Sequence, residues 1–217
     1  MMYPPEGHSN HSTYATPYQS LGSRGVNNLS SKLLLSLLPP NSPFFRLKID
    51  DYTLQELTGD EDARADVEEA LAKIERAVMD EVETTAIRVG VFEALKHLLI
   101  SGNVLVYLVP EGGVQIFTLE QYVVRRDTAG NVLQMLVLEK AHPYTLSEEV
   151  RTACAVEDPD NSQEDSDVEI YTSIEFSAKE QKWKVHQEIN DHVVPESEGT
   201  YLPEKAPWIP LRLYKID

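Results

Sequence analysis

The spacing of hydrophobic residues changes near the middle of the chain, and this change restricts the folds that the chain can form. Up to Gly102, apolar residues recur every three or four positions, which is the spacing of amphipathic helices. After Gly102, short segments rich in β-branched and aromatic residues alternate with turn residues, as strands do. No helical pattern long enough for a crossover connection interrupts the later strands. The sequence therefore predicts an α+β fold, with helices first and a mainly antiparallel β-sheet second.

This change of spacing divides the chain into three parts. We expect residues 1–15 to form a flexible N-terminal tail, residues 16–102 the helical part and residues 103–217 the β part. Within the β part, residues 157–169 are acidic and lack aromatic side chains, which predicts a mobile loop. The run that begins at Asp158 lacks the glycine that a calcium loop carries at its sixth position, so we expect no metal there.

The first predicted helix has an unusual distribution of apolar residues. It should begin at Thr16, with Pro17 in its first turn, and end near Leu38 before two prolines. Its leucines spread around most of the circumference, so the helix must be covered on several sides. Four small residues, Gly22, Gly25, Ser30 and Ser31, leave room for another backbone to come close. Two interpretations remain open: a core helix of this domain, or a helix that is partly covered by a neighbouring subunit.

The remaining elements follow simpler patterns. A second helix should carry one apolar stripe with acidic residues on its outer face, and a third should end with Gly102 as its cap. Residues 127–131 and 177–181 have the composition of hairpin turns. We expect Trp183 and Trp208 in the core of the sheet. The stripe of the second helix consists of Val67, Leu71, Ile74, Val78 and Val82.

Composition and motifs exclude several functions. A net charge of −17 does not suit a protein that grips DNA by neutralising phosphates, although an acidic surface lets the polymer slide past. No Walker loop, nucleophile elbow or zinc motif is present, and Cys154, the only cysteine, is expected to be an inert thiol. No apolar run approaches the ~20 residues that span a bilayer. We therefore expect a protein that is not an enzyme, holds no cofactor or metal and does not insert into a membrane.

Several segments resemble one known family. The segment TPYQSLGSRGVNNLSSKLLLSLLPPNSPFFRL, which starts at Thr16, closely resembles a segment near the N-terminus of portal proteins. These are the head-to-tail connecting proteins of short-tailed bacteriophages of the autographivirus type. VFEALKHLLISGNVLVYL, YVVRRDTAGNVLQMLVLEK, DVEIYTSIEF and GTYLPEKAPWIPLRLYKID are similar to that family in the same order. The resemblance extends from about Pro4 to Asp217.

The resemblance implies a structural role in the virion. It implies a ring of about twelve identical subunits at one capsid vertex, assembled in the host cytoplasm. The partners that it implies are other copies of the chain, the terminase, scaffold and capsid proteins, and tail proteins. Double-stranded DNA would pass through the central channel without sequence specificity during packaging and ejection. Family members begin earlier and continue far beyond this sequence, so the chain corresponds to the N-terminal wing region, and no DNA-contacting residue can be transferred to it.

We expect the subunit interface to involve polar and small residues in the most family-like helix, together with an arginine pair before the first hairpin turn. For the polar residues, helix capping and surface solvation are equally acceptable explanations. An alternative function is a truncated prophage-derived or cellular acidic adaptor that binds one protein partner without forming a ring. A third, a metal-dependent hydrolase, has no support in the sequence. The candidate interface residues are Arg24, Gly25, Asn27, Asn28, Ser31, Lys32, Arg125 and Arg126.

Overall fold

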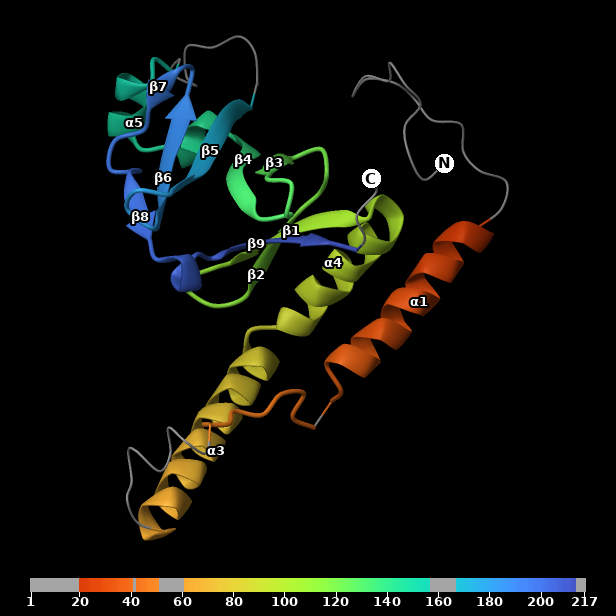
Figure 1. The fold of residues 1–217 in the computed structure, drawn as a ribbon. Coiled ribbons are helices and arrows are strands. Elements are labelled where there is room, and N and C mark those ends of the chain that lie inside the picture. The colour runs from red at the N-terminus through yellow and green to blue at the C-terminus, as the bar shows by residue number, and fades with distance from the viewer. Residues whose placement is uncertain (1–19, 41, 51–60, 157–166, 214–217) are drawn as a thin grey trace. The chain divides into compact units, whose positions relative to one another are not determined.

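The computed structural model confirms the α+β prediction (Figure 1). It describes residues 20–40, 42–50, 61–156 and 167–213. The chain forms two compact units. Three long helices belong to the first unit, and a six-stranded sheet belongs to the second. The first unit comprises residues 1–102, 108–116 and 212–217, and the second comprises residues 103–107 and 117–211.

Helix α1 (Leu21–Leu37) packs along α4 (Ile87–Ser101), and the two helices lie side by side in Figure 1. The predicted start at Thr16 lies outside the described residues. Ser20 occupies the N-cap position, but its side chain makes no capping hydrogen bond. The helix ends where the backbone N–H of Leu38 donates to the carbonyl of Leu34 at 2.8 Å, just before the two prolines. The least exposed side of α1 follows the three-and-four spacing and consists of Val26, Ser30, Leu33, Leu34 and Leu38.

The second and third helices are separated by a sharp break. Helix α3 (Glu61–Thr84) ends at a two-residue turn, where Ala86 adopts a left-handed conformation with φ 54°. At the far end of α4, Gly102 has φ 72° and its N–H donates to the carbonyl of Leu98 at 2.9 Å. Glycine adopts this left-handed cap without the steric cost of a β-carbon. The prediction that Gly102 ends the third helix is therefore confirmed.

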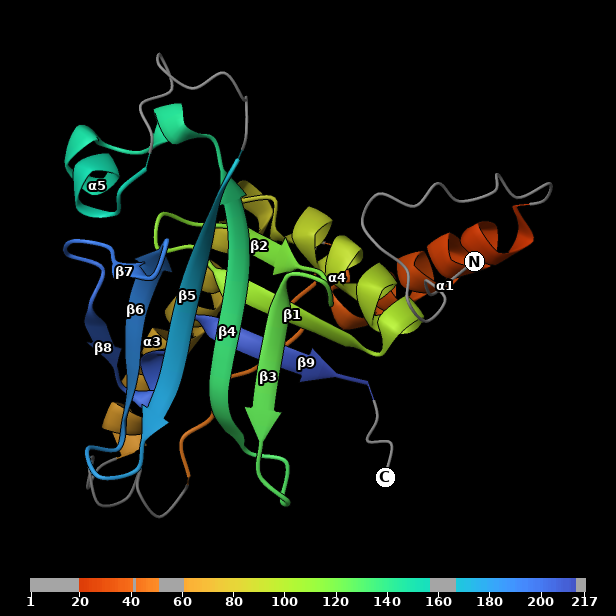
Figure 2. The same cartoon turned by 90° about the horizontal axis from the view of Figure 1, so that it is seen from above.

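The second unit is built on an antiparallel sheet, whose strands are seen side by side in Figure 2. Its order is β3-β4-β5-β6-β7, and β8 also pairs with β6. Both predicted hairpins are present, one between β3 and β4 and one between β5 and β6. The strand bounds are Tyr122–Arg126 for β3, Val132–Ala141 for β4, Val168–Ser177 for β5, Lys182–Ile189 for β6, His192–Val193 for β7 and Gly199–Tyr201 for β8.

Three further strands form a smaller sheet, in the order β2-β1-β9. Their bounds are Asn103–Leu108 for β1, Val114–Phe117 for β2 and Trp208–Arg212 for β9. The predicted acidic loop at 157–169 requires a correction, because β5 already begins at Val168. The paired strands β4 and β5 extend the ladder that far, with Ala141 opposite Val168. Residues 157–166 of that predicted loop lie outside the described residues.

The core of the second unit comes from one face of its strands. Alternation along each strand places every second side chain on this face, as expected for a sheet that is buried on one side. Trp183 and Trp208 pack against this core, which confirms their predicted place, and Trp208 stacks on Tyr107 with ring centroids 5.3 Å apart. The buried members are Leu105, Phe117, Tyr122, Met135, Val137, Ile174 and Val185.

A smaller core cluster surrounds the only cysteine. Cys154 follows the short helix α5 (Glu148–Ala153), which begins at Ser147, whose hydroxyl accepts a hydrogen bond from the N–H of Val150. The thiol is completely buried beside Ile189. Desolvation by this burial raises the pKa of Cys154 above its ordinary value. A thiol that is buried and protonated at neutral pH is a poor nucleophile.

Candidate subunit interface

All six candidate residues on α1 are exposed in the subunit. Four of them, Arg24, Gly25, Asn28 and Lys32, fall on the side of the helix opposite the positions that pack on α4. Leu29 and Leu35 lie among these four, and 47% and 59% of their surfaces remain exposed. Neither leucine is among the predicted interface residues. Leu29 lies four residues after Gly25 and Leu35 three residues after Lys32, and this helical spacing indicates that they share a face with those residues. We call Arg24, Gly25, Asn28, Leu29, Lys32 and Leu35 the α1 outer face.

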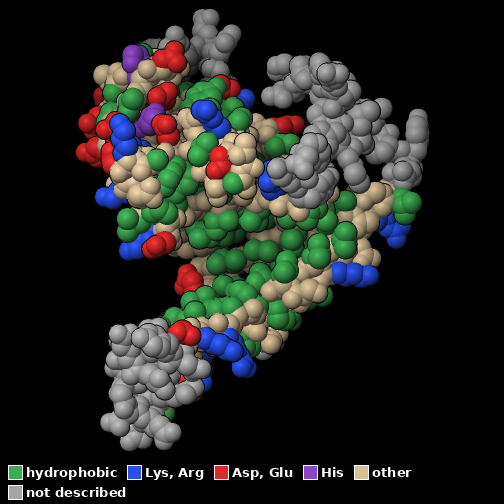
Figure 3. Space-filling view, viewed as in Figure 1, with side chains coloured by type: hydrophobic (Ala, Val, Ile, Leu, Met, Phe, Trp, Pro, Cys, Tyr) green, Lys and Arg blue, Asp and Glu red, His purple; other side chains and the backbone are tan. Residues whose placement is uncertain are grey.

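The α1 outer face has room for close contact. A β-carbon added at Gly25 would meet no atom within 4 Å. Nearby, the hydroxyl of Ser31 is turned back onto its own helix and donates to the carbonyl of Asn27 at 2.8 Å. Hydrophobic side chains gather over α1 and α4 (Figure 3). The α1 outer face therefore combines exposed leucines with a position that carries no side chain.

The apolar stripe of α3 is only partly covered. The sequence predicts this stripe opposite an acidic outer face, and Val82, one of its members, is buried. However, Ile74 is 51% exposed and Val78 is 40% exposed, so the middle of the stripe faces solvent within the subunit. The segment 42–50 reaches a different side of the helix, where the N–H of Leu47 donates to Glu75 Oε1 at 2.6 Å. The spacing correctly identified an apolar face but not what covers it.

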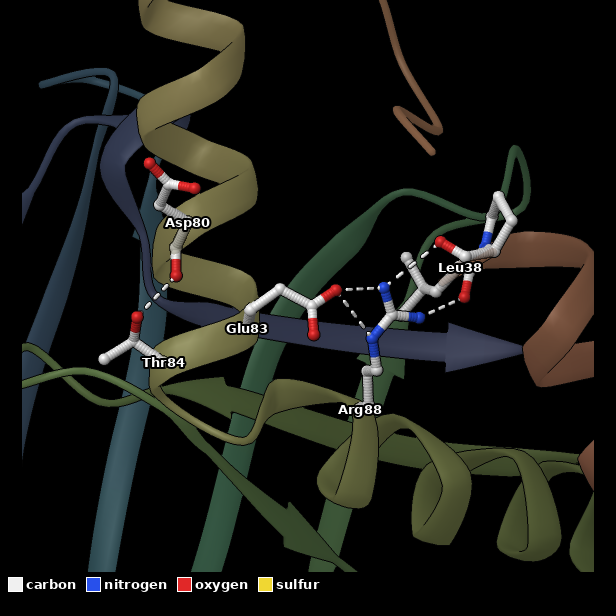
Figure 4. A network of polar contacts seen from close by, with 6 residues as sticks. Leu38, Asp80, Glu83, Thr84 and Arg88 are labelled. Carbon is white, nitrogen blue, oxygen red and sulfur yellow. Dashed lines mark hydrogen bonds and ion pairs between the residues drawn. The ribbon is translucent and has the colours of Figure 1, made fainter. Parts of the chain in front are cut away.

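Arg88 joins the end of α1 to the break between α3 and α4 (Figure 4). Its guanidinium pairs with the carboxylate of Glu83, with Nη2 2.5 Å from Oε1. It also donates to the carbonyl oxygen of Leu38 and, at 3.1 Å, to that of Pro39. The hydrogen bond from Arg88 holds the pKa of Glu83 below its ordinary value, and Glu83 in turn raises the pKa of Arg88. This contact joins the C-terminal end of α1 to the turn between α3 and α4.

The two arginines before the first hairpin turn differ in what they contact. Arg126 donates from Nη1 to the carbonyl of Gly130 and from Nη2 to the carbonyl of Pro210, both at 3.0 Å. It therefore joins the hairpin turn to β9 within its own unit. Arg125 is exposed, and the pairing of β3 with β4 is irregular between these two residues. Such a bulge re-aims a side chain, which fits the different contacts of the pair. Only Arg125 presents its charge on the surface.

Among the helices in the described part of the chain, none combines the length and the apolar character needed to cross a bilayer. Within the same part of the chain, no group of three or more His, Cys, Asp and Glu side chains could hold a metal ion.

The sequence was compared with known proteins. Residues 4–217 match the sequence model of the family described as bacteriophage head to tail connecting protein. The chain is 37% identical over 221 residues to the portal protein of Escherichia phage T7, and 36% identical over 220 residues to that of Enterobacteria phage T3. Both alignments cover 100% of the chain but 41% of the relative.

A third relative is more distant. The portal protein of Enterobacteria phage SP6 is 29% identical over 195 residues, which cover 89% of the chain and 38% of that relative. The chain thus spans about two-fifths of the length of these relatives, 41% for the two most similar named here. Because the match to the family extends over residues 4–217, the chain belongs to the bacteriophage head-to-tail connecting protein family.

Proposed function

We propose that this chain is the N-terminal wing part of a portal subunit, a structural component of the ring at the capsid vertex. The family match over residues 4–217 carries this proposal. In it, residues 16–102 form the helical part of the wing and residues 103–217 its β part. The T7 and T3 relatives are named portal proteins, and the chain aligns with 41% of each.

The surface of the subunit supports self-association. In a cyclic assembly each copy meets its two neighbours through two different faces. The chain exposes apolar residues on two separate helices, Leu29 and Leu35 on α1, and Ile74 and Val78 on α3. Covering these side chains removes apolar surface from water, which contributes roughly 25 cal/mol per Å² before the costs of association. The candidate interface set is accordingly Arg24, Gly25, Asn27, Asn28, Ser31, Lys32 and Arg125, with Arg126 contributing only through the shape of its turn.

The partners and location follow from the same proposal. The ring would be a conduit for genome packaging and ejection, with the terminase, scaffold and capsid proteins, and tail proteins as its partners in the virion. Double-stranded DNA would pass without sequence-specific contact. A net charge of −17 supports this part of the proposal, because an acidic surface repels phosphate and does not hold the polymer.

Mass photometry tests the proposal directly. The product of the complete reading frame that contains this chain is measured beside the 217-residue chain alone. A closed ring of the longer product, of about twelve copies, supports the portal function. Monomers or dimers of both proteins, with folding verified by circular dichroism, contradict it and favour the acidic adaptor that binds one partner without a ring.

Substitutions on α1 then test the surface. Gly25→Leu fills space that is empty in the subunit, so folding of the monomer should be retained while assembly weakens. Ser31→Leu should act in the same direction, because Ser31 is exposed and its hydroxyl donates to the carbonyl of Asn27 in its own helix. Gly25→Ala is the matched control with a minimal side chain. Equal loss of monomer folding and of assembly in the leucine variants contradicts the interface assignment.

A further inference from the structure

We propose that the α1 outer face of one copy docks against the exposed stripe of α3 on a second copy of this chain. The inference rests on the proposed ring function and names the two surfaces that meet. We define the α3 stripe as Ala70, Ile74, Ala77 and Val78, which are all exposed in the subunit. These four residues are spaced so that they share one side of the helix.

The two surfaces carry opposite charge. Helix α1 contains Arg24 and Lys32 and no acidic residue, so its charge is +2. Helix α3 contains nine acidic and three basic residues, so its charge is −6. Asp66 lies one turn before the α3 stripe and Glu81 one turn after it, and both are exposed. Opposite charges on two helix faces speed their association and favour the register that pairs them, whereas two copies of the same face repel each other.

The two surfaces also match in length and in their mixture of large and small side chains. The α1 outer face from Gly25 to Leu35 extends over ten residue steps, or ~15 Å, and the α3 stripe from Ala70 to Val78 over eight, or ~12 Å. Each face combines large and small positions: two leucines and Gly25 on α1, and Ile74, Val78 and two alanines on α3. A position with no side chain, such as Gly25, can accept a protruding side chain from a partner helix.

The contact is of the kind that closes into a ring. Because the two surfaces differ, each copy offers one of them to each neighbour, and the same contact repeats from copy to copy. A contact between two α1 outer faces would stop at a dimer and would place like charges together. Within one subunit, both faces remain exposed, so neither is already used to cover the other.

Chemical cross-linking of the full-length product tests the proposal. Gly25→Cys and Ala77→Cys are made singly and together, and a flexible bismaleimide tolerates the unspecified register of the helices. Cys154 is fully buried, so its thiol should react little with the bismaleimide. The double variant should give a ladder of covalent oligomers on a denaturing gel, whereas each single variant should stay mostly monomeric. If a single variant gives covalent dimers in as high a yield as the double variant gives oligomers, the proposal is overturned, because such dimers indicate contact between identical faces.

Charge reversal supplies a second test that does not depend on cross-linking. Arg24→Glu with Lys32→Glu, or Asp66→Lys with Glu81→Lys, should each lower the ratio of rings to monomers by about tenfold at fixed concentration. All four changes in one chain should restore most of the rings, because every contact then has its charges exchanged. Glu198→Lys with Glu204→Lys, two exposed acids on the second unit, is the control for net charge. Failure of the four-change chain to recover overturns the proposal.

The outcomes separate this inference from the proposed function. If the full-length product forms rings but the double cysteine variant gives no ladder, the portal function stands and the α1–α3 contact is wrong. If the full-length product stays monomeric while folded, the proposed function fails and this inference fails with it. A ladder together with recovery of the four-change chain supports both.

Discussion

Arg88 Nε and Nη2 both donate to Glu83 Oε1, at 3.1 Å and 2.5 Å (Figure 4). The same guanidinium also donates to the carbonyl oxygens of Leu38 and Pro39. One side chain therefore links the last turn of α3, the first turn of α4 and the end of α1. Arginine presents five N–H donors in a fixed plane, which lysine cannot reproduce. We therefore expect the end of α1 to depend on this guanidinium.

The first prediction concerns Arg88→Lys. The variant keeps the charge but loses the planar fork, so at least one of the carbonyls of Leu38 and Pro39 loses its donor. We expect a lower urea midpoint and faster amide hydrogen exchange in the last turn of α1, while exchange in the six-stranded sheet stays unchanged. Arg76→Lys, a change at an exposed arginine on α3, is the control. Unchanged exchange in α1 would show that the helix packs on α4 without this contact.

The second prediction concerns the pH dependence of the same pair. The pKa of Glu83 in the folded chain is lowered, chiefly by its hydrogen bond with Arg88. A lowered folded pKa gives stability that is fully present above the unfolded value, about 4.3, and is lost as the pH falls through the folded value. The difference in urea midpoint between the wild type and Glu83→Gln should thus be constant from neutral pH to about pH 6. It should shrink below about pH 4. A difference that grows on acidification contradicts the assignment.

The third prediction compares two helical glycines. A β-carbon at Gly90 would lie 2.1 Å from Val114 Cγ2, whereas one at Gly25 meets nothing within 4 Å. Gly25→Ala should raise the free energy of unfolding by about 0.5–1 kcal/mol, because alanine is the better helix former. Gly90→Ala should lower it, since overpacking of about 1–3 kcal/mol exceeds that gain. Urea unfolding measures both, and Val114→Ala added to Gly90→Ala should recover part of the loss. Equal changes in the free energy of unfolding at the two positions would contradict the close packing of Gly90 against Val114.

The sequence predicted local features well because each depends on neighbouring residues. Gly102 was identified as a cap from its place after an apolar periodic segment, and a left-handed φ of 72° confirms it. The hairpin turns were recognisable from their composition, and the β-branched and aromatic segments indicated the strands between them. These features follow from backbone sterics and side-chain periodicity, which act over a few residues.

The candidate site depended on contacts that no local pattern contains. Arg88 bonds to Leu38 across 50 residues, and Arg126 reaches Pro210 across 84. The arginine pair therefore looked equivalent in sequence, although only Arg125 is exposed. The apolar residues predicted on α3, from Val67 to Val82, are a similar case. Their periodicity identifies an apolar side of the helix but not whether the same chain covers it. Ile74 shows this most clearly, at 51% exposed.

The fourth prediction concerns Cys154. Burial removes the thiol from solvent and raises its pKa, so little thiolate is available at neutral pH. Native protein should be alkylated by iodoacetamide only as fast as it opens, and full alkylation should require denaturant. Mass spectrometry after timed quenching measures the rate, with Gly25→Cys as an exposed reference thiol. Rapid alkylation of the native wild-type chain would mean that the cluster around Ile189 is open to solvent.

The fifth prediction compares the two arginines of the first hairpin. Arg126→Ala removes two hydrogen bonds from a charged donor to the carbonyls of Gly130 and Pro210, and should lower the free energy of unfolding by about 1–2 kcal/mol. Arg125→Ala changes an exposed side chain and should stay within about 0.5 kcal/mol of the wild type. Urea unfolding followed by tryptophan fluorescence suits the measurement, because Trp208 begins the strand that Arg126 holds. If Arg125→Ala destabilises the chain as much as Arg126→Ala, the charge of the pair contributes to stability and the hydrogen bonds of Arg126 do not.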